Sequence, residues 1–149
     1  MTFRRSVILL AVVTASALFG QAAAQDGYRF DLKLTTPDAR HDPDDVWSDD
    51  DLAFIRQLGQ TPSIYTARLK TPAGEWLLSQ TNGDCNMQGM CTALLLLRKA
   101  GTKPVEMANP QLPLGGSATL SLNYKKLFTH EIDQNGKPLD GTYDVAPIE

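Results

Sequence analysis

The sequence is poor in the residues that most often carry chemistry, with only two cysteines and two histidines among 149 residues. It also lacks a basic excess, because 14 Lys and Arg stand against 17 Asp and Glu, a formal net charge of −3. Nucleic-acid binding depends on a basic surface, so this balance gives that function no support. Hydrophobic residues nevertheless make up 42% of the chain, which is enough to build a folded core.

Motifs for nucleophilic catalysis and phosphate binding are missing as well. The chain has no G-x-S-x-G sequence and no P-loop, and neither cysteine has a histidine close by in sequence. His130 stands beside Glu131 in a segment predicted to be a strand, where neighbouring side chains point to opposite faces. We therefore predict no catalytic residues, and a small hydrolase with His130 as its base remains the weakest alternative.

The second histidine, His41, lies in an acidic segment together with Asp38, Asp42, Asp44 and Asp45. Carboxylates are the ligands that calcium prefers, but their spacing here is not that of a calcium-binding loop. A solvated acidic loop is the commoner case. We therefore expect no metal site and no cofactor.

The N-terminal segment has the three-part layout of a secretory signal peptide. Arg4 and Arg5 precede an apolar run at residues 6–20, and small residues at 22–24 favour cleavage before Gln25. An uncleaved membrane anchor is the alternative, but the apolar run is short for a membrane span. We predict a signal peptide at residues 1–24 and a single exported domain at 25–149, periplasmic or secreted and not membrane-attached after cleavage. Cleavage would remove Arg4 and Arg5 and no acid, so the mature chain would have 12 basic and 17 acidic residues, a formal charge of −5.

The mature chain reads as an α+β domain. Tyr28, Phe30, Leu32 and Leu34 alternate with polar residues, which predicts a strand with one buried face. After a loop at 37–45, a helix is expected over residues 48–58. Further strands are expected at residues 63–70, 75–80, 92–99, 105–107, 119–124, 127–132 and 142–145.

Local signals define the ends of the helix and two connections. Ser48 is a good N-cap, and the three acids after it complement the helix dipole. Leu52, Ile55 and Leu58 mark the buried face, and Gly59 ends the helix. Asn135-Gly136 predicts a hairpin turn, whereas residues 109–116 read as a loop. The fold class is thus a mostly antiparallel sheet of about six strands with one short helix packed on it.

The leucine run at 94–97 is compatible with a helix or a central strand, and its shortness favours the strand. Before it lie the only cysteines, Cys85 and Cys91, which in an exported chain are expected to form a disulfide. The ring that they close holds Asn86, Met87, Gln88, Gly89 and Met90. Such a rigid turn either binds a partner or only ties two strands together.

The succession of elements resembles the periplasmic inhibitors of vertebrate lysozyme, the Ivy-type proteins. In chain order, a signal peptide is followed by a short helix at 48–58 and by the strand Gly74-Glu75-Trp76-Leu77-Leu78. The cysteine-closed loop comes next, and further strands follow it. The resemblance covers roughly residues 50–108 and rests on layout, not on a strict motif. It implies an antiparallel sheet from which the small loop projects into the cleft of a lysozyme.

One departure from the family concerns the loop itself. The family loop is one residue shorter and carries a histidine and an acid, whereas the ring at 86–90 has neither. The resemblance therefore implies occlusion of a lysozyme-like or other cell-wall hydrolase, or an immunity role, by a different set of contacts. We predict a protein partner of that kind and no enzymatic activity. A structural or accessory periplasmic domain, in which the ring is only a brace, is the alternative.

Overall fold

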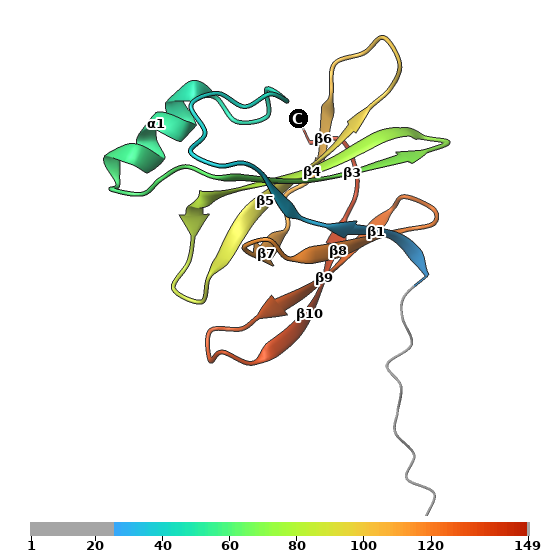
Figure 1. Cartoon of the computed structure of the whole chain (residues 1–149). Helices are drawn as coiled ribbons and strands as arrows, with labels where there is room; N and C mark the ends of the chain where they lie inside the picture. The colour runs from blue at the N-terminus through green and yellow to red at the C-terminus, as the bar shows by residue number, and fades with distance from the viewer. Residues whose placement is uncertain (1–25, 149) are drawn as a thin grey trace, which may run out of the picture.

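Antiparallel strand pairing dominates the structure, a computed structural model that describes residues 26–148 (Figure 1). The described part holds one short helix and ten strands in two sheets, which confirms the α+β class. The predicted signal peptide lies outside the described residues. Where we expected one sheet of about six strands, the strands divide between two sheets.

The larger sheet holds the ring. Its strand order is β2-β3-β4-β5-β6, and β7 also pairs with β5. These strands are β2 (Lys33–Thr36), β3 (Ile64–Thr71), β4 (Gly74–Cys85), β5 (Met90–Arg98), β6 (Val105–Ala108) and β7 (Gln111–Pro113). The leucine run is thus the central strand β5, as predicted, and the Cys85–Cys91 turn connects it to β4.

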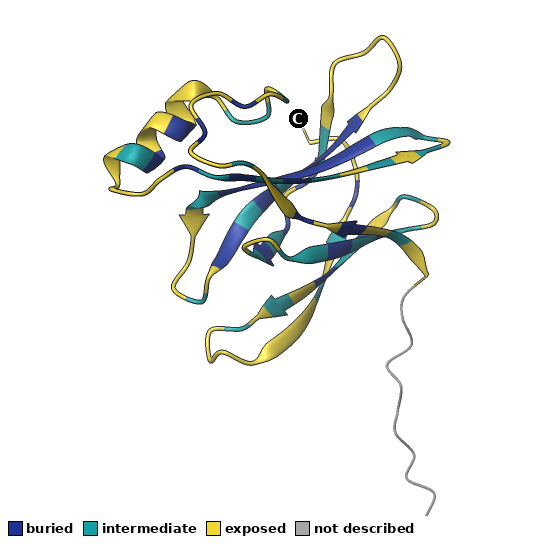
Figure 2. Cartoon of the chain, in the orientation of Figure 1, coloured by how far each residue is buried: buried dark blue, intermediate teal, exposed yellow. Residues whose placement is uncertain are grey.

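The smaller sheet has the strand order β1-β8-β9-β10. Its strands are β1 (Gly27–Asp31), β8 (Ser117–Ser121), β9 (Lys126–Ile132) and β10 (Pro138–Asp144). The predicted turn at Asn135-Gly136 joins β9 to β10, and Gly136 has the positive φ of 76° that glycine adopts without strain. This hairpin is largely exposed along β10 (Figure 2).

The main core lies between the two sheets. Every second residue of β4 and β5 faces it, because side chains alternate along a strand. Trp76, Leu78 and Leu95 come from the larger sheet, and Phe30 and Leu120 from the smaller one, each at most 1% exposed. Figure 2 shows this buried zone along β4 and β5. The leucine-rich composition of these strands is therefore explained by burial.

Helix α1 (Asp49–Gln57) packs on the opposite face of the larger sheet at one end, near the start of β3 and the end of β4 (Figure 1). The predicted N-cap is confirmed: the Ser48 hydroxyl accepts from the Asp51 amide, and the Asp51 carboxylate accepts from the Ser48 amide. Leu52 and Ile55 are buried in a second core cluster with Ile64. The prediction is wrong for Leu58, which caps the helix and is 54% exposed.

The predicted strand at residues 28–34 is wrong as a single element, because the chain changes sheets at Leu32. The Leu32 amide donates to the carbonyl of Gly116, so β1 pairs with β8 while β2 pairs with β3. Leu34, expected on the buried face, is 49% exposed after this crossing.

Several other boundaries differ from the sequence prediction. The strand expected at 75–80 is β4, which continues to Cys85, and the strand expected at 142–145 is β10, which begins at Pro138. The expected loop at 109–116 contains β7, since residues 111–113 pair with β5 beside the ring. The strand expected at 119–124 is β8, which ends at Ser121 because the chain turns there. Leu122 is 61% exposed, and Tyr124 has a positive φ of 60° and donates its amide to the Ser121 carbonyl.

Candidate functional site: the disulfide-closed turn

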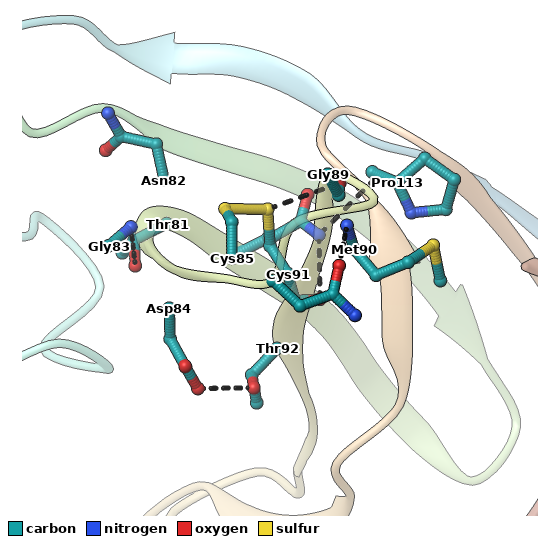
Figure 3. The surroundings of a disulfide bond; sticks show 12 residues. Thr81, Asn82, Gly83, Asp84, Cys85, Gly89, Met90, Cys91, Thr92 and Pro113 are labelled. Carbon is teal, nitrogen blue, oxygen red and sulfur yellow. Dashed lines mark hydrogen bonds between the residues drawn. A yellow bond between two sulfur atoms is a disulfide. The ribbon is translucent and has the colours of Figure 1, made fainter. Parts of the chain in front are cut away.

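The expected disulfide is present. The sulfur atoms of Cys85 and Cys91 lie 2.01 Å apart, and the two residues face each other at the end of the β4–β5 ladder. The ladder is irregular between Gln80 and Cys85, where β4 extends beyond its regular pairing. The disulfide therefore closes a projecting turn that continues two central strands (Figure 3).

Hydrogen bonds within the ring hold the turn independently of the sulfur bridge. The Asn86 side-chain oxygen accepts from the amides of Gln88 and Met90, both at 3.0 Å. The Asn86 amide donates to the Met90 carbonyl at 2.8 Å, and the Gly89 amide donates to the Asn86 carbonyl at 3.0 Å. Gly89 has a positive φ of 76°. Asn86 and Gly89 are thus residues that shape the turn.

The two methionines of the ring lie in opposite environments. Met87 is 100% exposed, whereas Met90 is 2% exposed. If the whole ring acted as a plug, Met90 would have to face outward. Its burial contradicts this expectation. Met90 is the first residue of β5 and pairs with Pro113 of β7, so its side chain belongs to the sheet. The exposed part of the ring consists of Asn86, Met87 and Gly89, with Gln88 half-buried.

Gln80 fastens the base of the ring to the neighbouring strand. Its side chain is fully buried, and its amide nitrogen donates to the carbonyls of Cys91 at 3.2 Å and Leu112 at 3.1 Å. Its side-chain oxygen accepts from the Gly115 amide at 3.0 Å. All of its polar atoms are thus satisfied, as burial of an amide requires. Gln80 was not singled out from the sequence, although a glutamine in the alternation of Trp76 and Leu78 is a signal.

The side chains of both histidines are exposed on the surface. His130 lies 2.9 Å from Asp140 across the β9–β10 pair, and their side chains are 80% and 86% exposed. Glu131 faces the other way and accepts from the Tyr143 hydroxyl. His41 lies 3.0 Å from Asp49, and this hydrogen bond, with the charge of Asp49, raises the pKa of His41. Both histidines therefore form surface pairs with a carboxylate.

The acidic segment around His41 is organised by Asp42. Its carboxylate is fully buried and accepts from the backbone amides of Asp44, Val46 and Trp47, each at 3.0 Å. This aspartate thus fixes the loop that leads into α1. Within residues 26–148, no three His, Cys, Asp or Glu side chains are grouped so that they could hold a metal ion.

Comparison of the chain with protein-family models, with curated protein sequences and with solved structures found no match. In the described part of the chain, no helix combines the length and the apolar character needed to cross a membrane. Among the described residues, the Cys85–Cys91 ring combines a covalent cross-link with a fully exposed apolar side chain, Met87.

Proposed function

We propose that the protein is an exported binding protein of the inhibitor or immunity type, which occludes a cell-wall hydrolase with the Cys85–Cys91 ring. The observation that carries this proposal is Met87, a large apolar side chain that is 100% exposed on a turn with fixed geometry. Single exposed apolar residues are common on protein surfaces, but Met87 lies at the tip of a cross-linked turn.

The physical basis is preorganisation. A turn that is already closed by a disulfide, by the Asn86 bonds and by the Gln80 clamp loses little backbone freedom when it enters a partner's cleft. Methionine is flexible and polarisable, so it adapts to apolar pockets of irregular shape. The same turn without the clamp would have to be ordered on binding, which weakens association.

Charge supports a cationic target. The mature chain has a formal charge of −5, and opposite charges on two partners mainly increase the association rate. Cell-wall hydrolases of the lysozyme kind are the targets that the Ivy-type layout implies. Because the ring has neither a histidine nor an acid, contact with the hydrolase would rest on Met87 and on backbone groups instead of on carboxylate or imidazole chemistry.

The test is an inhibition assay with residues 25–149 and a panel of cationic cell-wall hydrolases, including a vertebrate lysozyme. Met87→Asp should relieve inhibition of the responsive hydrolase, because a charge would enter an apolar contact. Leu122→Asp is the matched control, since Leu122 is also exposed but lies in the β8–β9 turn. Equal inhibition by both variants would contradict a binding role for the ring.

A structural role is the second candidate, and the anchoring of Met90 and Gln80 favours it. In that case the ring serves only to join β4, β5 and β7 at one end of the larger sheet. Met87 would then be irrelevant to every function, while removal of Gln80 or of the disulfide would still lower stability. Of these substitutions, only that of Met87 distinguishes the two candidate functions, because it should affect binding in the first and nothing in the second.

A further inference from the structure

We infer that the hairpin formed by β9 and β10 is a second binding prong, which acts beside the ring on the same cationic cell-wall hydrolase. This inference rests on the proposed function and adds residues that the ring does not contain. Figure 1 shows the β4–β5 turn and the β9–β10 turn side by side at one end of the molecule, and the Gln88 side-chain amide donates to the Gln134 carbonyl at 3.4 Å.

A chain of hydrogen bonds joins the two hairpins below their tips. On the ring side, the Thr92 hydroxyl donates to Asp84 at 2.6 Å (Figure 3). The same hydroxyl accepts from the Gln111 side-chain amide at 2.7 Å. On the hairpin side, the Tyr143 hydroxyl accepts from the Gln111 backbone amide at 3.1 Å and donates to Glu131 at 2.7 Å. β7 therefore bridges the two projections.

Gly141 is required for this arrangement. A Cβ atom at this position would collide with the Glu131 carboxylate and the Thr129 hydroxyl, so a side chain here would displace Glu131 from its present position. The missing side chain lets Glu131 fold over β10 and reach both Thr129 and Tyr143. The hairpin is thus tied to β7 through Tyr143, on the same side of the molecule as the ring.

Apolar side chains are exposed on both projections. Leu139 is 51% exposed and pairs with Glu131, so it lies on the hairpin face that also carries Tyr143. Leu114 is 40% exposed, and its amide donates to the Gly89 carbonyl at the base of the ring. Met87, Leu114 and Leu139, the exposed apolar residues near the two turns, are here called the two-hairpin edge.

The charge of this edge indicates the partner. The two turns with their adjoining strand ends, residues 84–92 and 130–140, contain four acids against one lysine, Lys137: the acids are Asp84, Glu131, Asp133 and, on the opposite face of β10 from Leu139, Asp140. A partner that fits the two-hairpin edge therefore has a cationic rim around a cleft that admits two adjacent turns. This description matches a cationic hydrolase and not an anionic membrane surface, which the acids would repel.

The experiment uses residues 25–149 and the hydrolase panel that tests the proposed function. Asp140→Lys and Asp144→Lys change the net charge equally, and both residues lie on the same face of β10, exposed by 86% and 84%. Only Asp140 is near the hairpin tip. We expect Asp140→Lys to weaken binding about tenfold more than Asp144→Lys, with the difference mainly in the association rate. Leu139→Asp should weaken binding mainly by speeding dissociation, because it removes an apolar contact, at an unchanged melting temperature.

Each outcome has a defined meaning. If Met87→Asp relieves inhibition while the Asp140 and Leu139 variants bind like the native chain, the second prong is refuted and the proposed function stands. If the chain binds no hydrolase of the panel, both proposals fail. Light scattering decides a third case: a dimer of the native chain that Leu139→Asp abolishes would make the two-hairpin edge a self-association surface and overturn the inference.

Discussion

Met87 and Met90 lie three residues apart in one disulfide-closed ring, yet Met87 is fully exposed and Met90 is 2% exposed. The backbone turn between them brings this about, because Met90 already belongs to β5 while Met87 stands at the tip. The ring therefore has a structural side and a solvent side. This division makes it possible to test binding and stability with separate substitutions.

The first prediction concerns these two methionines. Met90→Ala should reduce the free energy of unfolding by about 2–5 kcal/mol, because truncation of a buried methionine leaves a cavity. Met87→Ala should change it by less than about 0.5 kcal/mol, as is usual for exposed positions. Urea denaturation of both variants measures this. Similar losses in the two variants would show that Met87 is packed in solution.

The second prediction concerns Gln80. Gln80→Met keeps the volume but removes the hydrogen bonds to Cys91, Leu112 and Gly115. We expect a loss of about 1–3 kcal/mol in unfolding free energy, since buried carbonyls lose a donor. Hydrogen exchange of the Gly115 amide should accelerate. Gln60→Met, at an exposed position after α1, is the control and should leave both quantities unchanged.

The disulfide gives the third prediction. Because the ring is short, removal of the bridge in a Cys85→Ala/Cys91→Ala double variant should cost about 2 kcal/mol by loop-entropy arithmetic. The fold itself should persist, because the Asn86 bonds within the turn remain. Circular dichroism and denaturant midpoints, with and without reductant, provide the measurement. Reductant should destabilise the native chain and leave the double variant unaffected.

Tyr143 gives a prediction about pH. Burial, and then the hydrogen bond to Glu131 with its negative charge, raises the pKa of Tyr143 above its ordinary value of 10.0, although the Gln111 amide opposes the shift. A pKa that is higher in the folded state contributes stability that is complete below the unfolded value and is lost as pH rises through the folded one. The protein should therefore lose stability above about pH 10.

Glu131→Gln tests the cause of this shift. Without the carboxylate, the pKa of Tyr143 should decrease but stay above its ordinary value, because burial is the larger effect. Carbon NMR of labelled tyrosines across alkaline pH resolves Tyr143 from the other tyrosines. An unchanged pKa in Glu131→Gln would mean that the Tyr143–Glu131 bond does not form in solution, which would also remove one link between the two hairpins.

The helix was predictable because its signals are local. Ser48 and Asp51 form the capping box within one turn, and Leu52 and Ile55 are spaced for a single buried face. The disulfide was predictable for a similar reason, since the sequence has only two cysteines, close together in a chain predicted to be exported. Local spacing also gave the β9–β10 turn at Asn135-Gly136.

Features that depend on distant residues were not predictable. The division into two sheets begins at Leu32, whose amide finds its partner in Gly116, more than eighty residues later. The burial of Met90 depends on its pairing with Pro113, in a segment whose prolines indicated a loop. The contact between Gln88 and Gln134 joins two hairpins that the sequence gives no reason to place together.

The central claim is that the ring, through Met87, blocks a cell-wall hydrolase. Its most direct test is the rate of cell-wall lysis by each hydrolase of the cationic panel, a vertebrate lysozyme included, measured with increasing amounts of residues 25–149 and of Met87→Asp. The account predicts that the native chain suppresses lysis by at least one enzyme in a saturable manner and that Met87→Asp does so at least about tenfold less well. Undiminished lysis across the panel, or equal suppression by the native chain and Met87→Asp, would contradict it.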